Sequence, residues 1–481
     1  MADRFVFAYG TKRASSEAPS LNRSAAPSST GGSSPSVPAV AVAARARRER
    51  RDWAYVGLLA FTALLYFRPQ DSLRPLGVLH LPELAAIFAL GSLFLGRLQR
   101  GLVLTRVTPE LAAVFALGIV ILATAPFSVW MGGAVSTFLD MFAKVVLIFI
   151  LMVNTLTSTK RIERLTWLLV IASGYIAVWS VLDYVRGVNL LEAGRVRGSV
   201  GGMFRNPNDL ALNMVVAIPL ALSFILRPTS RLRTLVAMAC AGAMLAAIVA
   251  SGSRSGTLGL VTMTGVMALQ LLPRRPGLVA GGALAALLAL PLVPSSYWTR
   301  VASITDESVD DSGSREARTT LLAESWNAFL EDPLTGVGAG QFVNYNPEER
   351  VQAWKETHNV LLQVAAELGI FGLMAFGYLL VRGAKSAREV RTLLRKARAP
   401  TGAPAVVTPE ERSFLEVHSM AMLASLAGWF VCALFASVAY HWTLYYLLGL
   451  AVAPRELLTD RLAAEQPKDR TAPAYALEAR A

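Results

Sequence analysis

Long apolar stretches separated by short polar segments run through most of the chain. They cover 53–67, 79–96, 110–127, 138–157, 165–183, 208–226, 234–250, 256–272, 277–294, 358–381, 413–437 and 442–454. A stretch of about 20 apolar residues can cross a bilayer as a helix, although the first and last stretches are short for this. The pattern predicts an all-α polytopic membrane protein with about twelve transmembrane helices.

Basic residues in the connections predict the orientation of these helices. Arg and Lys are frequent in RLQRGLVLTR, TSTKRIER, RPTSRLR, PRRP and the 382–412 segment. A cytoplasmic N-terminus places all of these on the cytoplasmic side, as the positive-inside rule requires. The predicted organisation is a cytoplasmic tail at 1–52, transmembrane helices at 53–294, a large outer loop at 295–357, transmembrane helices at 358–454 and a cytoplasmic tail at 455–481.

The N-terminal residues 1–44 are rich in Ser, Ala, Pro and Gly. Such a composition buries too little apolar surface to offset the entropy of ordering, so we predict a disordered tail. No apolar stretch of the right length follows the start, and the segment is not expected to be a signal peptide.

Composition agrees with a membrane protein, since 54% of the residues are hydrophobic and 16% are charged, whereas a soluble domain has about a quarter charged residues. The formal net charge of +13 is spread between the apolar stretches, which indicates membrane topology and no nucleic-acid partner. Cys240 and Cys432 lie inside apolar stretches, so we expect them to pack in the core and to form neither a disulfide nor a metal site.

The outer loops carry many cations although topology disfavours them there. These residues are Arg186, Arg195, Arg197, Arg205, Arg254, Arg300, Arg315, Arg318, Arg350 and Lys355. A membrane-bound anion would account for cations on this side. Arg254, in SGSRSG, is predicted to lie in a tight turn between two helices, where its guanidinium offers two donors to a phosphate. The alternative is that Arg254 only extends to the membrane interface.

Two further cations are candidates for an anion site. Arg205, in GGMFRNPNDLAL, precedes a helix start with Asn208 or Asp209 as the expected N-cap, and the helix N-terminus would favour an anion beside it. The alternative is a simple cap with an unrelated arginine. Lys144 is four residues after Asp140 in an apolar stretch, where it forms either an internal ion pair or a phosphate contact.

His358 begins an outer-side helix in ETHNVLLQVAAELGIFG, and an imidazole can take a proton from a hydroxyl near neutral pH. Nine residues of helix give about 13 Å of rise, so Glu367 is not expected to contact it. Ala365, Gly369 and Gly372 form a stripe of small residues for a neighbouring helix. His441 could line the same cavity, whereas His80 and His418 are weaker candidates.

Three other motifs in the large loop receive structural interpretations. GVGAGQF, at 336–342, is interpreted as a tight turn, because no nucleotide-binding context accompanies it. DESVDD, at 306–311, is expected to be a solvated acidic loop. The segment SREARTTLLAESWNAFLED predicts an amphipathic helix at the membrane surface, with an apolar stripe of Leu322, Trp326 and Phe329.

Four of these motifs together resemble the O-antigen ligase and polymerase superfamily. They are GGMFRNPNDLAL, SGSRSG, an Arg and a Trp followed by DPLTGVGAGQF, and THNVLLQVAAELGIFG, which is close to that family's H-[NS]-x-x-L-x-x-x-x-E-x-G-x-x-G signature. The resemblance covers about residues 53–455. The spacing from Arg318 to Trp326 fits the family pattern only loosely.

The resemblance implies a multi-helix GT-C-type glycosyltransferase of the bacterial cytoplasmic membrane, with an active site on the periplasmic side. It would transfer a glycan from undecaprenyl diphosphate to an acceptor hydroxyl by inversion, without a metal ion or other cofactor. His358 would be the catalytic residue, and Arg205, Arg254, Arg318 and Lys144 would hold the diphosphate, with Arg315, Asn208 and His441 as further candidates. Other polysaccharide assembly proteins are expected partners.

The acceptor remains open at this level, because acceptor contacts lie in variable loops. A polymerase of a surface polysaccharide such as O-antigen or exopolysaccharide uses another lipid-linked glycan, a ligase uses lipid A core, and a protein O-oligosaccharyltransferase uses Ser or Thr. We favour the polymerase. A secondary transporter is the alternative of another class, but it should carry ionisable residues near the bilayer midplane, where the predicted helices have almost none.

Overall fold

The computed structural model describes residues 52–72, 79–191, 194–303, 314–348, 350–352, 354–397 and 406–465. The helices are α2 (Trp53–Phe67), α3 (Pro69–Ser72), α5 (Leu81–Leu98), α6 (Pro109–Thr124), α7 (Met131–Thr137), α8 (Ala143–Thr155), α9 (Thr159–Arg186), α10 (Pro207–Ile225), α11 (Arg231–Ser251), α12 (Arg254–Leu271), α13 (Pro276–Ala289), α14 (Ser295–Ala302), α15 (Ser314–Glu331), α16 (Val360–Lys396), α17 (Pro409–Ala433) and α18 (Trp442–Glu465).

Shorter elements join them: the 3-10 helices η1 (Ala125–Phe127), η4 (Gly202–Phe204) and η5 (Leu290–Leu292), the π-helix η2 (Phe138–Phe142), and the strands β1 (Leu190–Leu191) and β2 (Arg195–Val196). The two strands pair antiparallel in the loop between α9 and α10, a hairpin that the sequence did not predict. Almost all of the predicted N-terminal tail, and the acidic run DESVDD, lie outside the described residues.

The prediction of an all-α polytopic membrane protein is confirmed. Eight described helices are long and apolar enough to cross a membrane, and the bent pair of α13 and α14 would make nine. The predicted number of about twelve is therefore too high by these criteria. The other predicted segments do fold as helices, but α2 has only 15 residues, and α12 and α18 do not pass the combined test of length, apolarity and charge.

Polar residues placed just before the apolar stretches explain where several helices begin. Thr108, Ser158 and Thr408 each accept a hydrogen bond from a main-chain N–H of the first turn, which satisfies a donor that the helix itself cannot pair. Thr408 and Glu411 complete a reciprocal capping box. The N-cap of α10 is Asn206, so the prediction of Asn208 or Asp209 at this position was wrong by two or three residues.

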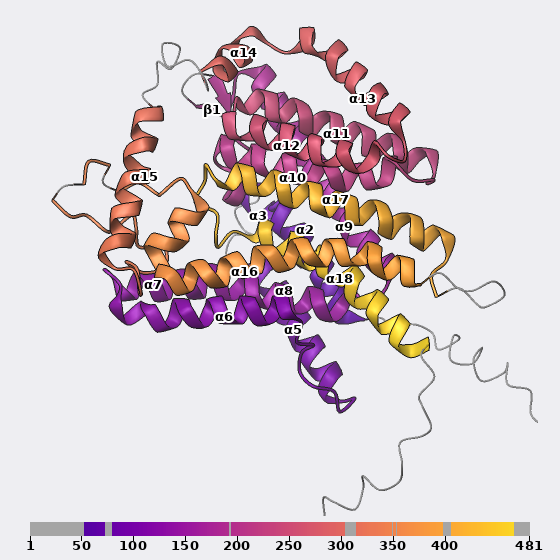
Figure 1. Cartoon of the computed structure of the whole chain (residues 1–481), viewed down its shortest axis with the longest axis horizontal. Helices are drawn as coiled ribbons and strands as arrows, with labels where there is room; N and C mark the ends of the chain where they lie inside the picture. The colour runs from indigo at the N-terminus through magenta and orange to yellow at the C-terminus, as the bar shows by residue number, and fades with distance from the viewer. Residues whose placement is uncertain are drawn as a thin grey trace, which may run out of the picture. The chain divides into compact units, whose positions relative to one another are not determined.

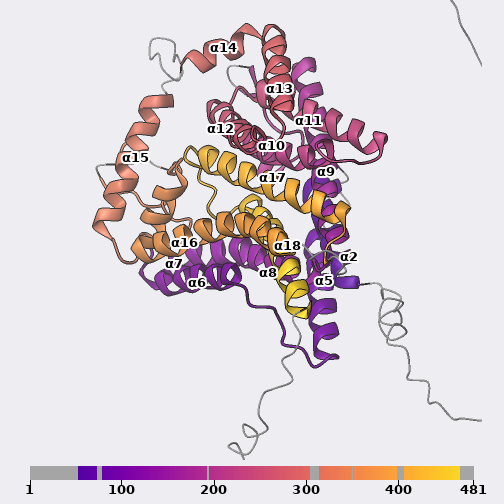
Figure 2. The same ribbon diagram turned by 45° about the vertical axis from the view of Figure 1, so that its right-hand side comes forward.

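Helix α17 lies between α12 and α16, and α10 packs against α17, α11 and α12 (Figures 1 and 2). The facing sides of these helices are buried and apolar, while α5 and α13 remain largely exposed. Cys240 and Cys432 are both unpaired within this helical packing, as expected. The arrangement brings the start of α12, the start of α16 and the end of α17 to the same end of the bundle, where the candidate site lies.

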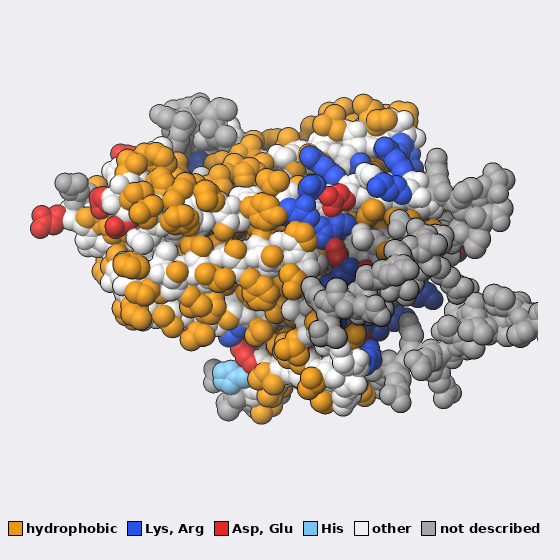
Figure 3. Space-filling model, turned by 60° about the horizontal axis from the view of Figure 1, so that its bottom comes forward, with side chains coloured by type: hydrophobic (Ala, Val, Ile, Leu, Met, Phe, Trp, Pro, Cys, Tyr) orange, Lys and Arg blue, Asp and Glu red, His pale blue; other side chains and the backbone are white. Residues whose placement is uncertain are grey.

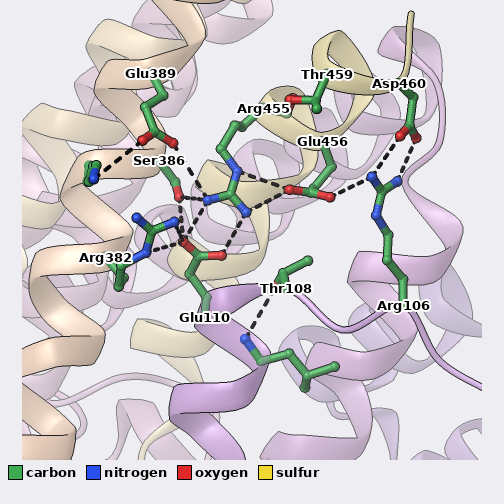
Figure 4. A network of polar contacts seen from close by, with 12 residues as sticks. Arg106, Thr108, Glu110, Arg382, Ser386, Glu389, Arg455, Glu456, Thr459 and Asp460 are labelled. Atoms are coloured by element: carbon green, nitrogen blue, oxygen red, sulfur yellow. Dashed lines mark hydrogen bonds and ion pairs between the residues drawn. The ribbon is translucent and has the colours of Figure 1, made fainter. Parts of the chain in front are cut away.

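A buried network of charges joins three helices at the opposite end of α16 (Figure 4). Glu110, at the start of α6, is fully buried and pairs with Arg455 of α18 at 2.8 Å and with Arg382 of α16 at 3.0 Å. Ser386 donates a further hydrogen bond of 2.7 Å to the same carboxylate. Since a buried carboxylate is stable only when it is paired, this network holds α6, α16 and α18 in one arrangement.

The surface separates into an apolar part and a basic part. Figure 3 shows hydrophobic side chains over much of one face, whereas Lys and Arg gather towards the end at which α16 ends and α17 begins. The separation agrees with the charge pattern of the connecting segments in the sequence.

Helix α15, in the large loop, buries one side against α16 and the loop that follows α15. This buried side carries Leu321, Ser325 and Ala328. The predicted apolar stripe of Leu322, Trp326 and Phe329 lies on another side, where Trp326 is 49% exposed. Contact of this stripe with the membrane surface stays a prediction.

Candidate functional site

One cavity of about 430 Å³ brings together residues from five parts of the chain, and we name it the His358 cavity. It is lined by Arg254, Ser255 and Leu258 of α12, Ser303 after α14, Arg318, Thr319 and Leu322 of α15, Thr357, His358 and Asn359 before α16, and Leu434 and Phe435 after α17. A histidine and two arginines thus face one space, as expected for a site that handles an anionic group.

His358 is held by its neighbours in an unusual backbone conformation. Its φ of 51° lies in the left-handed region, which costs a residue other than glycine some free energy and often marks a functional position. Its main-chain N–H donates a hydrogen bond of 3.0 Å to Ser437 Oγ. The next residue, Asn359, caps α16 by accepting from the N–H groups of Leu361 and Leu362. The chain on both sides of His358 is therefore fixed.

The environment of His358 favours its neutral form. Partial burial, together with the cations of Arg318 and Lys355, lowers the pKa of the imidazole below its ordinary value. A neutral imidazole at physiological pH can accept a proton from a hydroxyl group.

Arg254 is placed by the turn that joins α11 to α12. Gly252 ends α11 with a φ of 55°, and Ser253 caps α12 by accepting from the N–H of Gly256 at 3.1 Å. Arg254 is therefore the first residue of α12, one step beyond the turn in which it was predicted. Its Nη1 donates to the carbonyl and the hydroxyl of Ser303 at 3.3 and 3.1 Å, which aligns the guanidinium along the cavity wall.

Arg318 reaches the cavity because α15 is anchored on α16 through the GVGAGQF turn. The turn is tight, as predicted: Gly336, Gly338 and Gly340 all have positive φ. A small core of buried side chains lies beneath it, formed by Leu321, Ala328, Val337, Phe342 and Ala366. These contacts fix the helix that carries Arg318.

Gly369 makes this anchoring possible by interrupting α16. Its φ of 63° and ψ of −162° are non-helical, a combination that only glycine adopts readily. The interruption frees the carbonyls of Ala366 and Glu367, which accept from the N–H groups of Val337 and Gly338 at 2.8 and 2.9 Å. The N–H of Ile370 donates to the carbonyl of Pro333 at 2.8 Å. The predicted helix-packing role of Gly369 was therefore wrong, because a loop and not a helix approaches it.

Glu367 takes part in the same junction and not in a triad with His358. Its carboxylate accepts from the N–H of Gly340 at 2.8 Å and from the Tyr440 hydroxyl at 2.9 Å. The prediction that Glu367 does not contact His358 is confirmed.

Two arginines that the sequence did not single out lie beside the cavity. Arg195 donates through Nη2 to Asn208 Oδ1 at 2.8 Å and through Nε to the Ser251 carbonyl at 3.1 Å. Arg300 donates through Nε to the Gly252 carbonyl at 3.1 Å. Arg195 and Arg300 therefore both bind the main chain of the turn that precedes Arg254.

Burial and three neighbouring arginines lower the pKa of Arg195 to about 10. The three neighbours are Arg300, Arg318 and Arg254. Mutual repulsion of this kind shows that four guanidiniums share one region, and such a concentration of positive charge favours an anion. The signal in the sequence was the excess of arginines in the predicted outer loops, but sequence spacing could not show which of these arginines converge.

Other predicted residues lie elsewhere. Arg205 is exposed and does not line the His358 cavity. Asn208 lies beside the His358 cavity. Its Oδ1 accepts hydrogen bonds from Arg195 and, at 2.9 Å, from the hydroxyl of Ser253. His441 also does not line the cavity. Arg315 belongs to α15, but its side chain lies outside the described part of the structure.

Lys144 lines a separate cavity of about 450 Å³. Its ammonium pairs with Glu83 at 3.5 Å, whereas Asp140 accepts from Ser136 at 2.7 Å. Asp140 lines the same cavity as Lys144. Of the two alternatives for Lys144, the structure shows an ion pair, but with Glu83 of α5 as the partner and not with Asp140.

Comparison with known proteins gives an independent result. Residues 239–377 match the family model described as O-Antigen ligase. The matched region contains Arg254, Arg318, His358 and the Gly369 interruption. The comparison with curated proteins found no match. The family match confirms the resemblance seen in the sequence motifs: residues 239–377 are similar to the O-antigen ligase family.

Proposed function

We propose that this protein is a membrane glycosyltransferase that moves a glycan from undecaprenyl diphosphate to an acceptor hydroxyl. The observation that carries the proposal is the convergence of Arg254, Arg318 and His358 on one cavity, within the matched family domain. A histidine base alone, or a cluster of arginines alone, would be compatible with many functions. Together they fit a reaction in which a hydroxyl attacks and an anionic diphosphate departs.

In the proposed reaction, His358 takes the proton from the acceptor hydroxyl as its oxygen forms a bond to the anomeric carbon. The bond from that carbon to the diphosphate oxygen breaks, and its electron pair remains on the diphosphate. Arg254 and Arg318 stabilise the charge that develops there through charge-assisted hydrogen bonds. Attack from the face opposite the leaving group inverts the anomeric configuration, and the step needs no metal ion.

Charge pattern supports an orientation with the His358 cavity on the periplasmic side of the bacterial cytoplasmic membrane. Lys and Arg gather at the end where α16 finishes, and His358 precedes the first residue of the same helix. The positive-inside rule assigns the basic end to the cytoplasm. The cavity then lies on the side where surface polysaccharides are assembled.

Among the possible acceptors, we propose a second lipid-linked repeat unit, which makes the protein a polysaccharide polymerase. The test is reconstitution of purified protein with a defined undecaprenyl-diphosphate repeat unit, alone and with lipid A core, followed by sizing of the products. A ladder from the donor alone supports the polymerase. A single added glycan that requires the core shows a ligase, and no product in either reaction rejects glycan transfer from this donor.

A matched pair of histidine variants tests the proposed base. His358→Ala should abolish transfer, whereas His80→Ala should retain it, because His80 also has a positive φ but lies outside the cavity. Comparable membrane insertion and yield of the two variants would exclude a folding defect. Near-normal transfer by His358→Ala would remove the proposed base.

A further inference from the structure

The cavity that Lys144 lines has a polar part and an apolar part, and we name it the Lys144 cavity. Its polar lining residues lie where helices begin or end: Arg68 and Gln70 follow α2, Glu83 is in the first turn of α5, and Asp140 and Lys144 are in η2 and the first turn of α8. Apolar lining residues lie further along the same helices and include Leu65, Ile87, Leu90 and Leu147. This lining suits an amphipathic ligand.

The charges of this cavity lie deep within the apolar spans. Lys144 is near the middle of the 25-residue apolar span Met131–Thr155. The residues before it pack on the middle of a neighbouring span, because a Cβ at Gly118 in Pro109–Phe127 would meet the ring of Phe142 at 3.1 Å. Ionisable residues at this depth are costly, so they usually mark a binding site or a functional path.

The short helix α2 explains how a lipid headgroup can reach this depth. Its 15 residues give about 22 Å of helix, whereas the hydrocarbon core of a bilayer is about 30 Å thick. An apolar helix that is too short thins the bilayer around it, and the headgroups of the adjacent leaflet then lie deeper. We therefore expect lipid headgroups at the level of Arg68, the residue at which α2 ends.

The polar side chains suit a headgroup that carries charges of both signs. Lys144 Nζ and Glu83 Oε1 are 3.5 Å apart, and the two side chains are 41% and 43% exposed, so this loose ion pair leaves both groups able to bind a ligand. Gln70 Oε1 is buried and accepts no hydrogen bond from the described residues, although a buried acceptor normally has a donor. A primary ammonium group carries three N–H donors, which matches the acceptors of Glu83, Asp140 and Gln70.

The cations of the cavity match the other half of such a headgroup. Lys144 is a point charge that can bind a phosphate. Arg68 is already paired with Asp71 at 2.6 Å, which makes Lys144 the main phosphate partner. The φ of Arg68, 43°, lies in the left-handed region, a conformation that is often retained at functional positions.

We propose that the Lys144 cavity binds one phospholipid with a phosphoethanolamine headgroup. Glu83, Asp140 and Gln70 bind the ammonium, Lys144 binds the phosphate, and the first carbons of the acyl chains lie along the apolar wall. The bilayer is itself apolar, so the headgroup contacts and not the wall determine the affinity.

The bound lipid also has a structural consequence. Helix α5 is the least buried of the eight candidate spans in the described part of the chain, with 17% of its apolar window buried. A lipid between α5 and α8 adds packing to a helix that has little of its own. The inference is independent of glycan transfer.

The test compares three phospholipids with identical acyl chains on the full-length protein in detergent, with binding measured by native mass spectrometry. Phosphatidylcholine keeps both charges but has no N–H donor, and phosphatidylglycerol has no ammonium group. We expect phosphatidylethanolamine to bind about tenfold more tightly than either. An affinity for phosphatidylcholine or phosphatidylglycerol that equals or exceeds that for phosphatidylethanolamine would overturn the assignment.

Variants of the half-exposed ion pair locate the binding site. Glu83→Gln should remove the preference for phosphatidylethanolamine, whereas Lys144→Met should weaken all three lipids, because each of them carries the phosphate. Glu163→Gln is the matched control, since Glu163 also pairs with an arginine of another segment, Arg227, but does not line the cavity. Unchanged binding in either cavity variant, or the same loss in the control, would contradict the proposal.

Discussion

Replacing Gly369 with alanine should loosen the junction that fixes Arg318. A Cβ at this position would come within 2.5 Å of the carbonyl carbon and oxygen of Leu334 and within 2.7 Å of the Pro333 oxygen. These are backbone atoms, which cannot move aside as a flexible side chain can. Alanine would therefore either keep the strained conformation or expel the loop.

Both outcomes have similar costs. Retaining this backbone conformation costs about 1–3 kcal/mol, before any steric clash is added. Expelling the loop loses the three hydrogen bonds donated by Val337, Gly338 and Ile370, at about 0.5–1.5 kcal/mol each. We therefore expect Gly369→Ala to destabilise the docked loop by roughly 2–4 kcal/mol.

Hydrogen exchange measures this local destabilisation. Peptides covering 332–342 should exchange roughly 30- to 1000-fold faster in Gly369→Ala, and transfer activity should fall because α15 no longer holds Arg318 in place. Gly377→Ala on the same helix is the control, since a Cβ there has open space. Wild-type exchange across 332–342 in Gly369→Ala would refute the role assigned to the interruption.

Three further outcomes follow from the site and the buried network. Because burial and nearby cations lower the pKa of His358, its base form persists to lower pH, so transfer should rise with pH through a midpoint below about 6.5. Lys355→Ala should move that midpoint upward in a pH–rate profile, and an unchanged midpoint would argue against this coupling. Arg254→Lys should lower kcat/KM by about 10- to 100-fold, because a planar fork becomes a point charge; wild-type kinetics would indicate that Arg254 only extends to the interface. Glu110→Gln should lower stability by about 3–5 kcal/mol, since it removes the buried carboxylate that Arg382 and Arg455 share; an unaltered thermal melt in detergent would contradict this.

The apolar pattern located the helices well because membrane spans depend on local composition. The apolar pattern did not predict the features that depend on tertiary contacts. The side that α15 buries, with Leu321 and Ala328, follows from the loop and helix beneath it, and the amphipathic period of the sequence did not predict that contact. The partner of Lys144 was also missed, because Glu83 lies on another helix and sequence spacing cannot show which helices are neighbours.

The candidate site was partly predictable because its chemistry is unusual for its location. His358 and Arg254 stood out as polar residues at the ends of apolar stretches, and both line the cavity. Arg195 could not be distinguished from Arg205 in this way, since both are arginines in the loop between α9 and α10. The β1–β2 hairpin and its contact with Asn208 decide which of the two faces the turn of Arg254.

The Glu110 network also bears on how the protein is made. Glu110 and Arg455 are 345 residues apart in the chain, and a growing polypeptide emerges from its N-terminus. During most of synthesis, Glu110 in α6 therefore cannot yet pair with Arg455, because α18, the last described helix, has not been made. A chain that ends before α18 lacks the closest cationic partner of Glu110 and leaves this carboxylate paired only with Arg382 of α16. The Glu110–Arg455 ion pair thus forms only after every described helix of the bundle has been synthesised.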